Sequence, residues 1–394
     1  MGEFIVEEKK IIFVTRIRGF LNQLKENPNI KFKIENKNES YEVNTFKKEI
    51  ISKLIRSKIF NKIGVFQIVK YKNEASDICK LFSFNRFVES KHRYILYVEN
   101  PTALYHYSLG RNKGIWSKKK IKKLLNSPQL EGIYFMSNAS NRTFDEVCGK
   151  IPDNKLRETI YPLVPRNPYC TEHAINERTK QDLFKLLFVV QGKRFISKGG
   201  KELIKVMQDL QNLNIHLTVI TNKRLLSDSI KNDIYRSKNI SLIEFNLTYK
   251  ELEKEYASHH LLIHLSSDDS FGLTILEAMK AGLPIISTNL YAIPEMVVDG
   301  HNGFLTEPKY YFFDRNNIPN ESVWNHRKKT IYNENFICER IVEFTKEKVK
   351  QLYYDRNLLM LMSNNSLKRS SAAPFSEEYV SDLWNKAMGE NRND

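Results

Sequence analysis

The sequence predicts an α/β protein with two domains, each built around a parallel β-sheet. The chain has 394 residues, more than a single hydrophobic core usually serves. Short apolar runs of strand length alternate with longer stretches of helix length, which is typical of this fold class. Prolines crowd into IYPLVPRNP, residues 160–168, as they often do between domains. We therefore predict a domain boundary near residue 170.

The first half contains apolar runs of buried-strand length, separated by helical or polar stretches. These predicted strands are KIIFVTRI (10–17), GVFQIVKY (64–71), RYILYVEN (93–100) and GIYFMSN (132–138).

The second half alternates strand and helix more regularly. Strands are predicted over residues 182–192, 215–220, 240–245, 260–267 and 283–288, and helices over 201–213 and about 273–281. A further helix, ending near Ser258, begins at Thr248-Tyr249-Lys250-Glu251, which has capping-box spacing. Gly282 and Pro284 end the helix before the last strand. This succession predicts a parallel sheet with right-handed crossovers, whose ligands bind beyond the carboxyl ends of the strands.

Composition bounds the class of protein. Hydrophobic residues make up 41% and charged residues 27% of the chain, which argues against long disorder. No apolar run approaches the roughly 20 residues of a membrane span, and the first residues lack the pattern of a signal peptide. We therefore expect a cytoplasmic protein. Its four cysteines show no Cys-x-x-Cys spacing, which disfavours zinc and redox motifs and predicts reduced thiols.

Positive charge is concentrated in the first domain. Residues 1–165 contain 31 Lys and Arg against 17 Asp and Glu, a balance of +14 of the net charge of +16. The densest stretch, Arg111 to Leu125, interleaves lysines with apolar residues. It could lie on an anionic membrane surface or form a solvated helix with a few core-facing side chains. Nucleic-acid binding is not expected, because no recognised binding module accompanies the charge.

One segment of the second domain carries candidate ligand-binding groups: SSDDSFGLTILEAMKAGLPIIS, residues 266–287. Asp268, Asp269 and Ser270 follow a predicted strand, and Phe271-Gly272-Leu273 lead into a helix. A helix N-terminus attracts phosphate, and a glycine lets the backbone approach it. Glu277, about one turn further, can accept hydrogen bonds from vicinal hydroxyls. The pattern suits a nucleotide sugar, although Asp269 could also be a helix N-cap and Glu277 a solvated side chain.

Cations for a diphosphate are available after another strand. GKRFISKGG, residues 192–200, places Lys193, Arg194 and Lys198 at a strand's carboxyl end, with Gly199 easing the turn. Such cations stabilise a leaving diphosphate as its charge develops.

These motifs resemble the nucleotide-binding half of GT-B glycosyltransferases, in particular the retaining glycosyltransferase family 4. The resemblance covers residues 189–305. It rests on four ordered pieces: Gly192-Lys193 with Lys198-Gly199; Asp269, Phe271-Gly272-Leu273 and Glu277-Ala278-Met279 with Gly282-Leu283-Pro284; Pro294-Glu295; and Asn302-Gly303-Phe304-Leu305. The chain departs from the family at three places. It has Asp269 where the family has Glu, Lys193 where the family has Arg, and residues 290–293 where the family usually has a Gly-Gly loop.

The resemblance implies a fold, a reaction and roles for individual residues. The fold would be GT-B: two Rossmann-like domains facing a cleft, with the first over 1–170, the second over 171–374, and a terminal helix of about 375–394 packing on the first. The enzyme would be a retaining hexosyltransferase that uses a nucleotide sugar, UDP-sugar rather than GDP-sugar, and no metal or other cofactor. The implied catalytic residues are Lys198, Asp269 and Glu277. The implied donor-binding residues are Lys193, Arg194, Gly199, Ser270, Phe271, Gly272 and Leu273.

The acceptor side is predicted only in outline. By the same resemblance, acceptor contacts would come from Arg18, Gly19, Glu99 and His106. The basic charge of the first domain suggests that the acceptor is an anionic glycan or a lipid-linked molecule, as in surface polysaccharide or glycoconjugate synthesis. Residues 307–330 match no motif. Two alternatives stay open: a nucleotide-sugar epimerase or hydrolase of the same fold, and a non-catalytic nucleotide-sugar binder.

Overall fold

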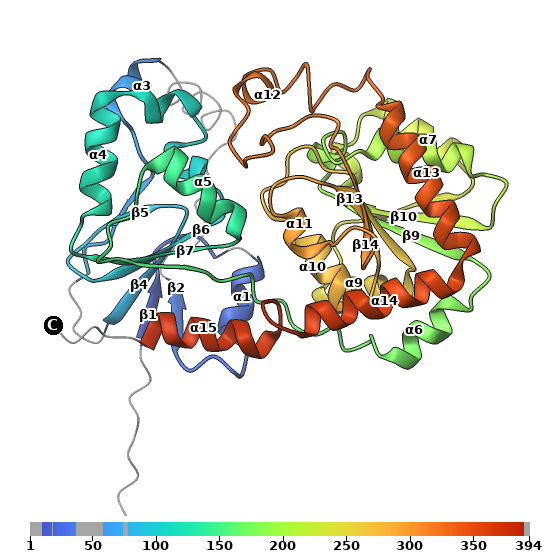
Figure 1. The fold of residues 1–394 in the computed structure, drawn as a ribbon, viewed down its shortest axis with the longest axis horizontal. Helices are drawn as coiled ribbons and strands as arrows, with labels where there is room; N and C mark the ends of the chain where they lie inside the picture. The colour runs from blue at the N-terminus through green and yellow to red at the C-terminus, as the bar shows by residue number, and fades with distance from the viewer. Residues whose placement is uncertain (1–9, 18, 37–57, 74–77, 390–394) are drawn as a thin grey trace, which may run out of the picture. The chain divides into compact units, whose positions relative to one another are not determined.

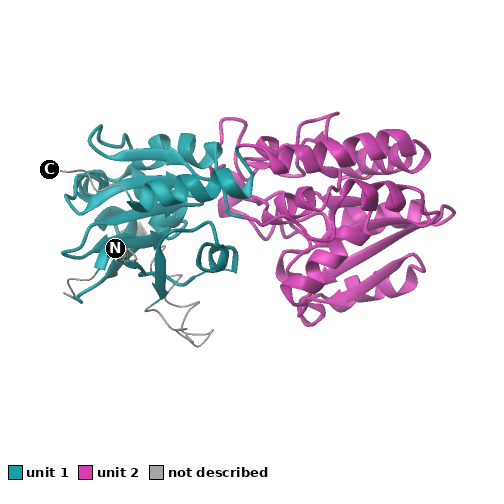
Figure 2. Ribbon diagram, turned by 90° about the horizontal axis from the view of Figure 1, so that it is seen from below, with its two compact units in different colours: residues 1–163, 374–394 teal, residues 164–373 magenta. Residues whose placement is uncertain are grey.

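A computed structural model of the chain describes residues 10–17, 19–36, 58–73 and 78–389. The chain divides into two compact units, residues 1–163 with 374–394, and residues 164–373. The two units are coloured separately in Figure 2. The first unit is therefore discontinuous in sequence, because its last helix follows the whole of the second unit.

Unit 1 is built on a parallel sheet with the strand order β2-β1-β4-β6-β7-β8 in its described part (Figure 1). Its strands are β1 (Lys10–Phe13), β2 (Lys33–Asn36), β4 (Ile78–Phe84), β6 (Tyr94–Val98), β7 (Leu130–Phe135) and β8 (Leu156–Thr159), with a separate pair of β3 (Ile68–Lys70) and β5 (Phe87–Glu89). Its helices are α1 (Gly19–Glu26), α3 (Lys58–Ile63), η1 (Pro101–Tyr105), η2 (Leu109–Lys113), α4 (Ile115–Leu125), α5 (Asn138–Cys148) and α15 (Glu377–Gly389).

The central strand β4 was not predicted from the sequence. It lies between β1 and β6. Lys80 and Ser83 are both buried in this strand, and these two polar residues interrupt the apolar run by which a buried strand is recognised in a sequence. The Lys80 ammonium pairs with Glu131 and donates a hydrogen bond to the carbonyl of Ala387 in α15. A lysine is tolerated in a core only with such partners, and they come from residues far away in sequence.

Unit 2 is a second parallel sheet, with the order β11-β10-β9-β12-β13-β14. Its strands are β9 (Phe184–Val189), β10 (Ile215–Thr221), β11 (Ile240–Glu244), β12 (Leu261–His264), β13 (Ile285–Thr288) and β14 (Gly303–Thr306). Its helices are α6 (Glu172–Thr179), η3 (Gly192–Arg194), α7 (Gly200–Asp209), η4 (Lys223–Leu225), α8 (Asp228–Arg236), α9 (Tyr249–Ser258), α10 (Leu273–Lys280), α11 (Ile293–Met296), α12 (Glu321–Asn325), α13 (Glu339–Tyr354) and α14 (Arg356–Ser371).

The local signals of unit 2 act as the sequence indicates. Thr248 and Glu251 form a capping box, in which the Thr248 side chain accepts from the Glu251 amide and the Glu251 carboxylate accepts from the Thr248 amide. Gly282 adopts φ +63° directly after α10, a conformation that glycine takes without strain. A Cβ there would stand 2.7 Å from the Ile175 side chain, so α6 packs closely on this turn.

The unmatched stretch after residue 306 is anchored to the rest of unit 2. Lys309 forms a buried ion pair with Glu202 at 2.8 Å, and Trp324 stacks on Phe312 with ring centroids 4.1 Å apart. The Trp324 indole N–H also donates to the Phe312 carbonyl. Aromatic stacking therefore organises this segment, which contains one short helix, α12.

Candidate functional site

The order of strands in unit 2 locates the site. The chain runs outward from β9 through β10 to β11, then returns to β12 beside β9 and runs outward the other way to β14. Parallel α/β sheets bind ligands at such a switch point, beyond the carboxyl ends of the two strands. The loops that follow β9 and β12 are residues 190–199 and 265–272. These are the two segments that carry the predicted cations and carboxylates.

Lys198 joins these two loops. Its side chain is only 7% exposed, and its ammonium lies 2.6 Å from Asp269 Oδ2 and 3.6 Å from Asp268 Oδ1. It also donates a hydrogen bond of 3.0 Å to Ser266 Oγ. Gly199 permits this approach, because a Cβ at that position would stand 2.5 Å from the Leu265 Cβ. The predicted cation and carboxylate are thus in direct contact.

Arg194, rather than Lys193, is the second cation held at the acidic loop. Arg194 Nη2 donates to Asp268 Oδ2 at 2.9 Å and to the Asp268 carbonyl at 3.1 Å. Lys193 is exposed on η3. A guanidinium offers several donors in a fixed plane. Arg194 can therefore keep its hydrogen bonds to Asp268 and still present other N–H groups to a ligand.

Asp269 stays ionised. Burial alone would raise the pKa of its carboxyl group, but the Lys198 ammonium, the hydrogen bond from His264 and the charge of Arg194 together hold that pKa well below the usual value. His264 Nε2 lies 2.6 Å from Asp269 Oδ2. Burial lowers the pKa of His264, which keeps the imidazole neutral at neutral pH. The loop therefore presents a fixed anion between a cation and a neutral donor.

The predicted helix start is present. Gly272 precedes α10 with φ +89°, and a Cβ there would stand 3.7 Å from Asp269 Oδ2. The Ser270 amide donates to Asp269 Oδ1, and Phe271 is buried beneath the turn. The positive end of the α10 dipole, at Leu273, thus lies beside the charged loop, as an anion site requires.

Glu277 lies one turn into α10, and its carboxylate accepts a hydrogen bond of 2.8 Å from the Tyr256 hydroxyl. Burial raises the pKa of Glu277 to about 7; the hydrogen bond from Tyr256 opposes this rise and the charge of Glu253 adds to it. The side chain borders a small pocket that Pro165, Tyr249 and Leu252 also line. When it is ionised, the Glu277 carboxylate can accept hydrogen bonds from hydroxyl groups.

Three contributors to this site were not predicted from the sequence. His264 ends the buried strand β12, and Tyr256 is the buried residue of the largely exposed helix α9. The position of His264 at the end of its strand was a usable signal. Tyr332 lies just beyond residues 307–330, the stretch without a motif, and its hydroxyl lies 3.4 Å from Asp268 Oδ2. No sequence signal connects Tyr332 to this loop.

The predicted acceptor residues belong to unit 1, and Arg18 lies outside the described residues. Gly19 is the first residue of α1, after β1. Glu99 follows β6, and its backbone amide donates a hydrogen bond of 2.9 Å to Asn85 Oδ1. His106 ends η1 with φ +56°. Glu99 thus lies at the end of β6, and His106 lies at the end of the short helix η1 that follows it.

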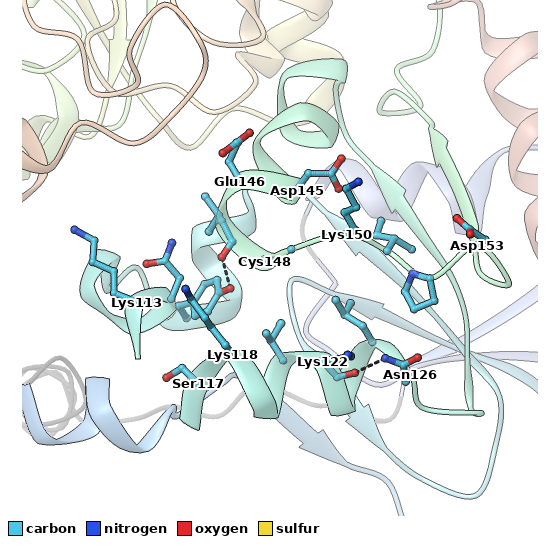
Figure 3. A pocket seen from close by; sticks show the side chains of 18 residues that line it. Lys113, Ser117, Lys118, Lys122, Asn126, Asp145, Glu146, Cys148, Lys150 and Asp153 are labelled. Atoms are coloured by element: carbon cyan, nitrogen blue, oxygen red, sulfur yellow. Dashed lines mark hydrogen bonds between the residues drawn. The ribbon is translucent and has the colours of Figure 1, made fainter. Parts of the chain in front are cut away.

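The basic segment of unit 1 has two different faces. Lys118 and Lys122, on one side of α4, line a cavity of about 810 Å³, which Figure 3 shows together with Lys150 and Glu146 on the opposite side. Ile115 and Trp116 at the start of α4 are 73% and 70% exposed. Arg111, by contrast, is fully buried and donates to the carbonyls of Val65 and Tyr105. The surface part of this segment thus begins after Arg111.

Within the described ranges, no cluster of three or more His, Cys, Asp or Glu side chains has the arrangement of a metal site. In the same ranges, no helix is both long enough and apolar enough to cross a bilayer.

Comparison with known proteins places this site in context. Residues 173–311 match the family model described as glycosyl transferases group 1. The chain is 25% identical over 194 residues to N-acetyl-alpha-D-glucosaminyl L-malate synthase of Bacillus anthracis, a match that covers 43% of this chain and 45% of that protein. It is 26% identical over 280 residues to an uncharacterized glycosyltransferase of Methanocaldococcus jannaschii, covering 68% and 74% of the two chains. The match thus spans less than half of the Bacillus relative.

Among solved structures, HepE of Anabaena in complex with UDP and glucose superposes with a TM-score of 0.60 at 13% identity, covering 97% of this chain and all of HepE. The fold is GT-B. In GT-B terms, the second Rossmann-like unit carries the Lys198 and Asp269 loops at its switch point. The predicted fold class is confirmed.

Proposed function

We propose that this GT-B protein is a retaining glycosyltransferase that binds a nucleotide sugar through unit 2, with a UDP-sugar favoured. One observation carries the proposal: at the switch point of the sheet, Lys198 and Arg194 are held against the loop that opens α10, and Glu277 lies one turn beyond. Cations beside a helix start suit a diphosphate, and the carboxylates on either side suit hydroxyl groups. HepE, whose fold is similar, is described in complex with UDP and glucose.

In this proposal each residue has a defined role. Lys198, Arg194 and the start of α10 bind the diphosphate and stabilise the charge that develops on it as the sugar leaves. The Glu277 carboxylate accepts hydrogen bonds from the ribose hydroxyls, and the Asp269 carboxylate accepts one from a hydroxyl of the donor sugar. The acceptor hydroxyl attacks from the face that the diphosphate leaves, and a phosphate oxygen takes its proton. These cations do the work that a metal would otherwise do, so the proposed reaction needs no bound metal.

The acceptor is proposed to be a glycan or lipid-linked molecule, as in surface polysaccharide or glycoconjugate synthesis. We also propose a peripheral location on the inner face of the plasma membrane, for which the start of α4 would supply the contact with anionic lipid. Ile115 and Trp116 are exposed side by side, and Lys119 Nζ lies 5.6 Å from the Trp116 ring centroid. Aromatic and aliphatic side chains flanked by lysines favour an anionic lipid interface.

The test begins with the donor. UDP-, GDP- and ADP-sugars are screened for a rise in the thermal unfolding midpoint. The sugar that binds is then supplied in radiolabelled form with a membrane fraction as the source of acceptor. Glu277→Gln, which keeps an acceptor for Tyr256, is expected to lower transfer by about tenfold to a hundredfold. Lys198→Ala is expected to lower it by about a hundredfold or more.

Controls separate the competing functions. Glu347→Gln, a substitution of an exposed side chain on α13, should leave transfer unchanged. Consumption of the donor without any acceptor, followed by NMR, would favour an epimerase or hydrolase instead. Binding without turnover would favour a non-catalytic binder. Wild-type transfer rates in both Glu277→Gln and Lys198→Ala would refute the assignment of this site.

The structure also changes what Lys198→Ala should do to stability. From the sequence alone, the variant would be expected to unfold much like the wild type. In the structure, Lys198 is the ion-pair partner of a carboxylate whose side chain is only 14% exposed, and removing one partner of a buried pair costs about 3–5 kcal/mol. Loss of activity in this variant is therefore interpreted only with a measured unfolding curve.

A further inference from the structure

His264 contacts the carboxylate that the proposed function assigns to the donor sugar. Its Nε2 lies 2.6 Å from Asp269 Oδ2, and its Nδ1 lies 3.3 Å from Thr274 Oγ1. The ring is 3% exposed. Its strand position is fixed as well, because the Ser287 hydroxyl of the neighbouring strand donates to the His264 carbonyl at 2.7 Å. His264 is thus held by β12, β13 and α10 together.

The two ring nitrogens have different partners. Asp269 stays ionised and can only accept, so Nε2 carries the proton and donates to it. Nδ1 is then an acceptor, and the Thr274 hydroxyl donates to it. The charged groups that face the ring are Asp269, Asp268 and Lys198, and burial lowers the pKa of His264 in their presence. The arrangement therefore selects one neutral tautomer.

Asp269 has little capacity left for a ligand. A carboxylate has about four acceptor positions. His264 and Lys198 share Oδ2, and the Ser270 amide occupies one position on Oδ1. About one position on Oδ1 remains, and its direction depends on how Oδ2 is held. Lys198 constrains this direction less than a ring N–H does, because its ammonium acts as a point charge with rotatable donors.

We propose that His264 is a positioning residue, which fixes Asp269 so that the remaining lone pair of Oδ1 accepts one hydroxyl of the donor sugar. The inference rests on the proposed function of the site and assigns to His264 a role in sugar recognition, not in nucleotide binding. Thr274 supports this role indirectly, because its hydrogen bond to Nδ1 fixes the tautomer of His264. Groups that orient a binding residue in this way have effects close to those of the binding residue itself.

A matched pair of substitutions tests the role. Gln carries an N–H donor at about the reach of Nε2, whereas Met has a similar length and no donor. The affinities of UDP, UDP-glucose and UDP-N-acetylglucosamine are measured by calorimetry for wild type, His264→Gln, His264→Met and Asp269→Asn. For the UDP-sugar that binds the wild type best, the ratio of its affinity to that of UDP is the measure of sugar recognition. His264→Met is expected to reduce this ratio by about tenfold, and the same loss is expected for Asp269→Asn. His264→Gln should retain most of the preference, and UDP itself should bind the wild type and both His264 variants about equally.

A second measurement does not depend on the donor. In ¹⁵N-histidine-labelled protein, the His264 resonances should show the tautomer protonated at Nε2. They should move in Asp269→Asn and show more of the other tautomer in Thr274→Val. Thermal unfolding of each variant identifies any that fail to fold. If His264→Met is one of them, the test is the comparison of His264→Gln with the wild type.

The outcomes separate this inference from the proposed function. An unchanged preference for the UDP-sugar in folded His264→Met would overturn the positioning role alone, as would an Nδ1-protonated ring in the wild type. Equal losses of UDP and UDP-sugar affinity would show a general structural role and would also overturn it. If the wild type bound no nucleotide sugar, the proposed function would be wrong and this inference would be lost with it.

Discussion

At the scale of single residues, unit 2 concentrates ionisable groups where they are costly. Asp268, Lys198 and His264 are buried next to one another, and Asp269 joins them. Burying charged groups is unfavourable even when they are paired, and a fully apolar loop would stabilise the fold at least as well. The lowered pKa values of His264 and Asp269, which lie together at the end of β12, therefore indicate a binding or catalytic role.

Glu277 gives a residue-scale prediction about stability. Burial raises its pKa from 4.5 to about 7 in the folded chain. A raised folded-state pKa contributes stability that is present below the unfolded value and is lost as the pH rises through the folded value. Relative to Glu277→Gln, the wild type should therefore lose up to about 3 kcal/mol in free energy of unfolding between pH about 4.5 and about 8. Denaturant unfolding of both proteins across this range measures the difference.

The control is Glu347→Gln, at an exposed position of α13. Parallel stability curves for wild type and Glu277→Gln would show that Glu277 has an ordinary pKa.

At the scale of elements, α4 shows how one basic helix serves two surfaces. Residues three and four apart share a helix face, so Lys118 and Lys122 line the cavity of unit 1 while Trp116 and Lys119 lie together on another face. The exposed side chains of Ile115 and Trp116 make no contribution to the core of this unit. Their exposure is the basis for the proposed lipid contact.

The membrane prediction concerns this helix. The wild type is expected to sediment with phosphatidylglycerol vesicles and not with phosphatidylcholine vesicles, and salt should weaken the binding. Replacing both Ile115 and Trp116 by Ser should reduce binding by about tenfold or more, because the apolar anchor is lost. Tyr235→Ser, which removes an equally exposed aromatic from unit 2, is the control. Undiminished sedimentation of the double variant, or none by the wild type, would contradict the prediction.

At the scale of the whole molecule, unit 1 contains a helix, α15, that follows unit 2 in the sequence. Trp384 of α15 is buried among Phe82, Tyr97 and Tyr134 of the unit 1 sheet. Asn27 donates to Glu377 at the start of the same helix. The aromatic contacts and the polar ones fix α15 on unit 1, so unit 1 lacks part of its core until the final residues are present.

Trp384→Ala should therefore destabilise unit 1 by about 3–5 kcal/mol, the usual cost of truncating a large buried aromatic. Hydrogen exchange followed by mass spectrometry can monitor peptides from β6 and β9 separately. Faster exchange is expected in β6 and unchanged exchange in β9. Tyr379→Ala, on the same helix but 41% exposed, should have little effect. Equal acceleration in both units, or none in β6, would show that α15 is not an integral part of unit 1.

The sequence by itself determined the features that depend on neighbouring residues. The strand, turn and helix from residue 261 to residue 280 lie within one short stretch, so periodicity, the Gly272 bend and the Gly282 stop predict them without knowledge of the rest. The capping box at Thr248 and the alternation of unit 2 are local in the same way. Family motifs are equally local, which explains why the candidate donor residues could be named in advance.

Only the tertiary structure decided which groups meet. Lys198 and Asp269 are 71 positions apart in sequence and 2.6 Å apart in space. Arg194 replaced Lys193 as the held cation, and Tyr256, His264 and Tyr332 joined the site. The strand β4 was missed because Lys80 finds its partners on other elements. Such contacts depend on strand order and helix packing, and their energies are set by burial, which a local pattern of residues does not contain.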